Sequence, residues 1–177
     1  MAIEFVVEDG TGKSDATSYI SVADMKQYWD NMGYDYSALT DDEIEVLLNK
    51  CTQAIDGMYF NHWKGIRSSS SQALQWPRAY ASYPDGYLNT STSVPKELPD
   101  AVSELAYIKN SGTDIQPTDE GSGELAAESV SVTPVSESKT YVPGTYRSHP
   151  KITAVEDILK PLLGPIGKYG KLEFERV

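Results

Sequence analysis

Residues 40–59 constrain the fold most, because they have the pattern of a long amphipathic helix. Thr40 followed by Glu43 is a capping box, which satisfies backbone N–H groups at a helix N-terminus. Acidic residues follow in the first turns, where the helix dipole favours negative charge. Apolar residues then recur at helical spacing over four turns: Ile44, Leu47, Leu48, Cys51, Ala54, Ile55 and Met58. The sequence therefore predicts a helix over 40–59.

Three further segments have shorter helical patterns. A second capping box, Ser21 with Asp24, opens a helix over 21–32 that Gly33 ends. Residues 96–110 carry apolar positions on one face, with Pro99 as the expected helix start. Residues 152–160 form a short amphipathic pattern that Pro161 should end or kink. We predict a mainly α protein, a small helical bundle of about four helices with a β-hairpin insertion and an extended C-terminal arm.

The chain divides into four predicted regions by composition. Residues 1–110 are the helical core, 150–163 a short helix that packs on it, and 164–177 an arm. Residues 111–149 are rich in Ser, Thr and Glu, and alternating Val130 and Val132 with Tyr141 and Val142 predict a hairpin. Such a hairpin is either disordered or paired with an edge on another chain, and we favour the inter-subunit pairing.

The C-terminal arm is either a frayed terminus or a docked segment. A docked arm would present apolar and aromatic anchors with lysines between them: Ile166, Lys168, Tyr169, Lys171, Leu172 and Phe174.

The charge balance of the chain opposes a general nucleic-acid binder. The 177 residues carry a formal net charge of −11, whereas a binder needs cations that displace counterions from phosphates. Only the last 32 residues are basic. The single cysteine, Cys51, fits a buried apolar position. The start of the chain lacks the features of a signal peptide, and we expect a soluble protein made in a reducing cytoplasm.

Motifs for catalysis or cofactor binding are weak. The GTGKS run at Gly10–Ser14 imitates a phosphate-binding loop, but Val7 stands where the pattern needs its first glycine. His62 and His149 lack the spacing of metal ligands. No serine lies in a nucleophile elbow. We therefore predict no enzyme activity, no metal and no cofactor.

The segment Ser68–Arg78, SSSSQALQWPR, fixes an aromatic side chain beside a cation, because Pro77 keeps Trp76 out of the helical region. Two interpretations are open for the aromatic residues near it. They form a base-stacking surface with cations, or the tryptophans cap the core while the arginines bridge acids on a neighbour. The residues concerned are Trp63, Arg67, Trp76, Arg78, Tyr80, Tyr83 and Tyr87. The net charge favours the second interpretation.

Five segments, in this order along the chain, resemble a family of tailed-bacteriophage proteins. They are VEDGTG, the acidic helix, Trp76-Pro77-Arg78, DGY at 85–87 and VPKELPDAV at 94–102. Members of this family are often named DnaT-like single-stranded-DNA-binding proteins, but by shape and context they look like head–tail connector adaptors. The resemblance covers roughly residues 4–110 and a short helix near 150–163.

The resemblance implies a structural virion protein of the neck, made in the bacterial host cytoplasm and lying between the capsid portal and the tail. It implies a ring, twelvefold by expectation, that binds the portal through the arm, offers a platform to neck or tail proteins and passes genomic DNA without specific binding. Asp41, Asp42 and Glu45 would then line the channel. The alternative is a single-stranded-DNA-binding replication accessory protein.

Overall fold

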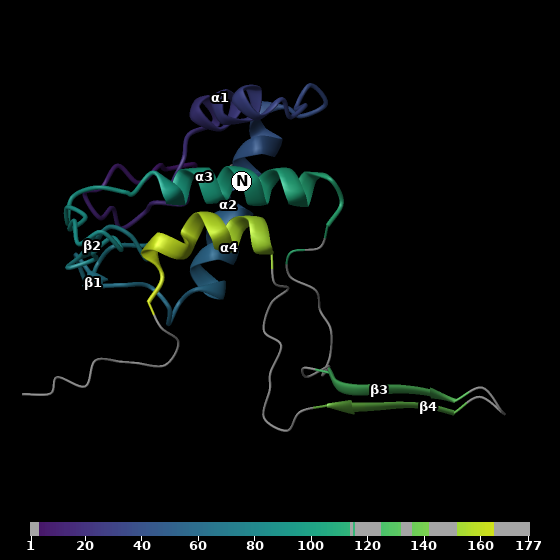
Figure 1. Cartoon of the computed structure of the whole chain (residues 1–177). Helices are drawn as coiled ribbons and strands as arrows, with labels where there is room; N and C mark the ends of the chain where they lie inside the picture. The colour runs from purple at the N-terminus through teal and green to yellow at the C-terminus, as the bar shows by residue number, and fades with distance from the viewer. Residues whose placement is uncertain (1–3, 114, 116–124, 132–135, 142–151, 165–177) are drawn as a thin grey trace, which may run out of the picture. The chain divides into compact units, whose positions relative to one another are not determined.

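Four α-helices and two small antiparallel ladders make up the described part of the chain (Figure 1). The computed structural model describes residues 4–113, 115, 125–131, 136–141 and 152–164. The elements follow in the order α1 (Val22–Met32), α2 (Asp41–Met58), β1 (Ile66–Arg67), β2 (Arg78–Ala79), α3 (Glu97–Asn110), β3 (Leu125–Ser131), β4 (Ser136–Tyr141), α4 (Thr153–Leu159) and the 3₁₀ turn η1 (Lys160–Leu162). The prediction of a mainly α protein with a hairpin is confirmed.

Helix α3 is the centre of the helical unit, because α1, α2 and α4 all pack against it. Each helix contributes side chains that are fully or almost fully buried. They are Met25 and Trp29 from α1; Ile44, Leu48, Cys51 and Ile55 from α2; Leu98, Val102 and Leu105 from α3; Val155 and Leu159 from α4. The apolar stripe predicted on 40–59 is thus the face that α2 turns toward the core.

The helix ends follow from local chemistry, with one correction. Thr40 and Glu43 form both hydrogen bonds of a capping box, and Gly33 ends α1 in the left-handed conformation. Helix α3 begins at Glu97, so the prediction that Pro99 marks its start is wrong. Proline is tolerated there because first-turn N–H groups have no partner within the helix. Pro161 turns the end of α4 into the 3₁₀ turn η1.

The chain divides into two compact units. The first consists of residues 1–113 and 152–177, and the second, residues 114–151, contains the hairpin. Strands β3 and β4 pair in antiparallel register, with Leu125 opposite Tyr141 and Val130 opposite Glu137. Of the four residues that predicted the hairpin, Val130 lies in β3 and Tyr141 in β4. Val132 and Val142, like the predicted arm residues 166–174, lie outside the described residues.

The GTGK loop binds an anion from its own chain. The carboxylate of Glu8 is buried and accepts hydrogen bonds from the backbone N–H groups of Gly10, Gly12 and Lys13 at 2.8–2.9 Å. Converging backbone N–H groups make a good anion site, and here Glu8 fills it. This internal contact satisfies the converging N–H groups of the GTGK loop within one chain.

The three acids predicted to line a channel lie at the start of α2. Asp41 and Asp42 are exposed and Glu45 is partly buried. Asp41 pairs with Lys26 of α1, and the first-turn acids complement the helix dipole. Their position is therefore explained within one subunit. Among the described residues, none of the helices is long and apolar enough to cross a bilayer.

Candidate functional site

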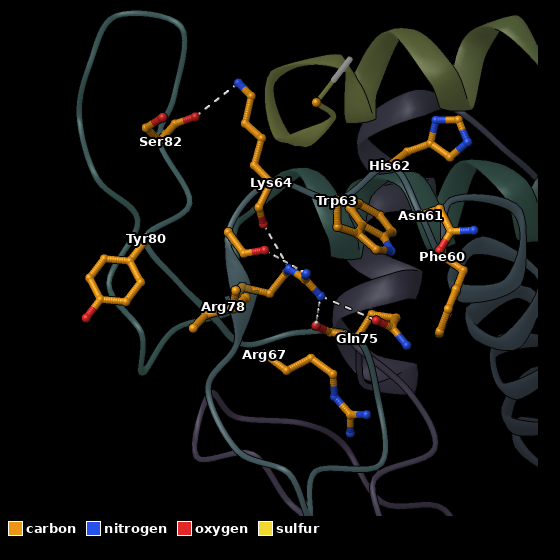
Figure 2. Close-up of a pocket in the computed structure, with 13 residues that line it drawn as sticks. Phe60, Asn61, His62, Trp63, Lys64, Arg67, Gln75, Arg78, Tyr80 and Ser82 are labelled. Carbon is orange, nitrogen blue, oxygen red and sulfur yellow. Dashed lines mark hydrogen bonds between the residues drawn. The ribbon is translucent and has the colours of Figure 1, made fainter. Parts of the chain in front are cut away.

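A cavity of about 660 Å³ lies beside the β1–β2 ladder (Figure 2). Two stretches of sequence supply most of its wall. The first, residues 60–67, runs from the turn after α2 to the end of β1, and the second, residues 75–82, contains β2. Gly164, just after η1, completes it and donates a backbone hydrogen bond to the His62 carbonyl at 2.6 Å. The lining residues are Phe60, Asn61, His62, Trp63, Lys64, Gly65, Ile66, Arg67, Gln75, Arg78, Tyr80, Ser82 and Gly164.

The cavity wall is cationic. Lys64, Arg67 and Arg78 line it, and no aspartate or glutamate is among its described lining residues. Within the described part of the chain the ion pairs are made by Lys13, Lys26 and Lys96. The three cations of the cavity wall therefore form no ion pair with a described residue. The Asp56 carboxylate does not line the cavity, although it lies near enough to Arg67 and Arg78 to interact with both. Positive charge concentrated in a cavity wall attracts anions. This local field contrasts with the net charge of −11 for the whole chain.

Arg78 is a fixed part of the cavity wall. Its side chain is 8% exposed, and its guanidinium donates to the carbonyls of Lys64 and Gly65 at 2.8 Å and to Gln75 at 3.2 Å. Figure 2 shows the Arg78 guanidinium between Lys64 and Gln75. The hypothesis that the arginines bridge acids on a neighbour is therefore wrong for Arg78, because carbonyls of its own chain use its donors. Burial lowers the pKa of Arg78 from its ordinary value.

Lys64 and Arg67 differ in how accessible their charges are. The Lys64 ammonium donates to the carbonyls of Ser82 and Pro161 at 3.0 and 2.8 Å, which ties the cavity to η1. Arg67 is exposed, and its guanidinium donates to the Gln72 carbonyl while its other N–H groups have no described partner. Arg67 is thus the cation best placed to contact a ligand from solvent.

Three large apolar side chains beside the cations are exposed to solvent. Phe60 is 59% exposed, Ile66 61% and Tyr80 78%. Figure 2 shows Phe60 and Tyr80 on opposite sides of Arg78. Exposed rings close to unpaired cations are the combination that binds unpaired nucleotides, because rings stack on bases while cations contact phosphates.

A buried hydrogen-bond network supports the cavity from below. Asp56 on α2 accepts from the Tyr19 hydroxyl at 2.7 Å and from the Gln75 backbone N–H at 3.0 Å. The Tyr19 hydroxyl in turn accepts from the backbone N–H of Trp76 at 3.1 Å. Trp76 is fully buried, and its ring meets Trp63 edge to face with centroids 6.0 Å apart. The network holds the Gln75–Arg78 segment against the helical core.

Gln72 organises the loop before this segment. Residues 72–75, GlnAlaLeuGln, contain good helix-forming residue types, but they form an irregular loop. The buried Gln72 side chain accepts from the Ser69 N–H and donates to the carbonyls of Leu74 and Pro77. One amide therefore satisfies three backbone groups that a helix would have paired internally.

The structure divides the aromatic and basic residues that the sequence singled out. Trp63, Arg67, Arg78 and Tyr80 line the cavity, whereas Trp76 lies in the core. Tyr83 does not line the cavity, and its hydroxyl donates to Glu97 at 3.1 Å. Sequence reasoning missed Phe60, His62, Lys64 and Gln75 as site residues. The signal was present in the run YFNHWKG at 59–65, in which aromatic residues alternate with polar and basic ones.

Residues 3–177 match the model of a family described as "Putative DnaT-like ssDNA binding protein". The chain belongs to this family. No curated protein and no solved structure matches it. The description names a binding activity, and binding to single-stranded DNA was the alternative in the sequence analysis.

The match corrects the principal functional prediction. By the family description, the interpretation as a head–tail connector adaptor is wrong. The calls that went with it are wrong as well: the twelve-subunit ring, the portal and the neck or tail proteins as partners, and a channel that DNA passes without binding. The reason for the error is physical. The net charge sums over the whole surface, whereas a ligand responds to the charges within about one Debye length, roughly 10 Å.

Proposed function

We propose that this chain is a non-catalytic protein that binds single-stranded DNA at the cavity beside β1–β2. The observation that carries the proposal is the wall of that cavity. It combines three cations and two exposed rings, with no acid among its described lining residues, in a chain of net charge −11. The family description supports the same ligand.

The size of the cavity suits a short stretch of nucleic acid. A volume of about 660 Å³ lies within the roughly 300–1,000 Å³ typical of ligand sites. Arg67 contacts a phosphate, the fixed charges of Lys64 and Arg78 add to the attraction, and Phe60 gives a base an apolar surface. Because few cations take part while the rest of the surface is acidic, we expect weak affinity with a clear salt dependence.

The test is fluorescence anisotropy of a labelled oligothymidylate between about 20 and 200 mM salt. For single strands, the logarithm of the binding constant falls by about 0.7 per phosphate contact for each decade of salt. Substituting Arg67→Gln should weaken binding at low salt and reduce that slope by about 0.7.

Lys50→Gln is the matched control, because Lys50 is an exposed cation on α2 that does not line the cavity. Both variants change the net charge equally, so a purely global effect would weaken both alike. Absence of binding by the unmodified chain at 20 mM salt would refute the proposed function. Equal loss in both variants would refute the cavity as its location.

A further inference from the structure

Tyr80 is the most exposed of the large apolar side chains at the cavity, and its backbone is unusual. Its φ is 60°, and it is the one non-glycine residue with positive φ among the described residues. L-residues with a bulky side chain avoid this left-handed region, because their Cβ crowds the backbone. Asparagine and aspartate offset the cost with a local side-chain hydrogen bond, which tyrosine cannot form.

Packing does not explain why a tyrosine occupies this position. Its side chain is 78% exposed, and its hydroxyl has no hydrogen-bond partner among the described residues. Figure 2 shows the ring extending outward from the cavity wall. A residue held in an unfavourable conformation with its side chain in solvent is the kind of outlier found at ligand sites.

The surrounding backbone fixes this conformation. Gly65 has φ 69°, and a Cβ there would lie 2.2 Å from the Ala79 carbonyl oxygen and 2.7 Å from the Ala81 backbone nitrogen. The backbone at Gly65 therefore packs closely against the residues before and after Tyr80, Ala79 and Ala81, at the point where β2 ends. Lys64 adds its hydrogen bond to the Ser82 carbonyl. The ring is thus carried on a constrained turn.

We propose that Tyr80 is a stacking platform for an unpaired base, and that it makes the site prefer single-stranded over double-stranded DNA. The inference rests on the proposed function and deepens it. Arg67, on the strand paired with β2, contacts the phosphate of the same strand of DNA. Phosphates are present in single strands and duplexes alike, so Arg67 does not discriminate. A base inside a duplex is already stacked on its neighbours, so the ring selects for unpaired bases.

The test is Tyr80→Gly, assayed for folding and for binding to an oligothymidylate and to a duplex. Glycine adopts positive φ without strain, so the urea midpoint should stay at or above that of the unmodified chain. Affinity for the single strand should fall by about 5- to 150-fold, the range for loss of one stacked base. Affinity for the duplex should stay the same, so the ratio of the two should fall by the same factor.

Two further variants make the result specific. Tyr80→Phe keeps the ring and should retain single-strand affinity. Tyr87→Gly removes a ring that is 74% exposed but does not line the cavity, and should bind as the unmodified chain does.

The possible failures are distinguishable. No binding by the unmodified chain refutes the proposed function itself. If the unmodified chain binds and Arg67→Gln weakens it while Tyr80→Gly does not, only the role of Tyr80 is overturned. A large drop in the urea midpoint of Tyr80→Gly would also overturn it, because the ring would then be structural.

Discussion

At the scale of single residues, Asp56 lies where the helical core meets the cavity. Its carboxylate accepts from Tyr19 and from the backbone of Gln75, and Arg67 and Arg78 are near enough to lower its pKa. Burial opposes these contacts and dominates, and it raises the pKa of Asp56 from 3.8 to about 6. The site thus includes one negative group beneath its cations, and that group titrates close to neutral pH.

The raised pKa predicts how stability depends on pH. Between pH 3.8 and 6 the folded chain holds a proton on Asp56 that the unfolded chain has lost. Protonation therefore favours folding at acid pH, and the contribution is lost as pH rises through 6. At about 1.4 kcal/mol per pH unit, the change amounts to about 3 kcal/mol. Asp56→Asn removes it, so urea unfolding at pH 4 and pH 7 should show the variant gaining up to about 3 kcal/mol relative to the unmodified chain.

Glu43→Gln is the control with the opposite sign. Hydrogen bonds from the backbone and side chain of Thr40 lower the pKa of Glu43, so its contribution to stability is present above its unfolded pKa and is lost as pH falls. The Glu43→Gln variant should therefore lose stability relative to the unmodified chain as pH rises from 4 to 7. A constant difference between Asp56→Asn and the unmodified chain across this range would contradict the assignment.

At the scale of elements, the sequence predicted the four helices well and the region 59–95 poorly. The helices carry their own signals, such as the capping box of Thr40 and Glu43 and the left-handed Gly33. Residues 59–95 have no such period. Their shape depends on contacts between distant side chains and backbone, such as Arg78 with Gly65 and Lys64 with Pro161. Gln75 was missed as a site residue for this reason, since only the folded chain brings it to the cavity.

A comparison of two glycines, Gly10 and Gly86, separates the cost of backbone strain from the cost of close packing. Gly10 has φ 98°, and a Cβ there would lie 2.3 Å from the Thr92 carbonyl oxygen. Gly86 has φ 90°, but a Cβ there would meet nothing within 4 Å. Gly86→Ala should therefore cost only the conformational strain, about 1–2 kcal/mol. Gly10→Ala should cost clearly more, because the backbone at Thr92 must also move.

Urea unfolding of both alanine variants measures the difference directly. If the N-terminal loop and the 90–93 loop pack as the structure shows, the Gly10 variant is the less stable of the two. Equal costs would mean that the two loops separate easily and that the Glu8 turn does not support the rest of the fold.

At the scale of the whole molecule, the net charge of the chain does not describe the local charge at the cavity. The acids dominate the sum of −11, yet several of them are used in local structure, such as Glu8 in the GTGK loop and Asp41 with Lys26. The three cavity cations bond to backbone carbonyls. A net-charge argument from the sequence treats all these groups as free in solvent, and it therefore favoured the wrong function. The pairing of each charge is a property of the fold.

The division into two units predicts that the helical unit folds without the hairpin unit. All residues that line the cavity lie in the first unit, in 60–82 and at Gly164. Ile115 is 1% exposed and is therefore kept. Residues 116–151 are replaced by a flexible Gly/Ser linker of about ten residues. Because the buried side chains of α1 to α4 are all retained, we expect one cooperative unfolding transition with a midpoint close to that of the full chain.

The same variant tests whether the hairpin takes part in binding. Oligothymidylate affinity at low salt should equal that of the full chain, since Arg67, Tyr80 and their supporting hydrogen bonds are unchanged. The full chain with Arg67→Gln gives the reference for a damaged site. If the shortened chain folds but binds as weakly as that reference, the hairpin unit contributes to the interface. If it loses its cooperative transition, the helical unit depends on the removed residues for its stability.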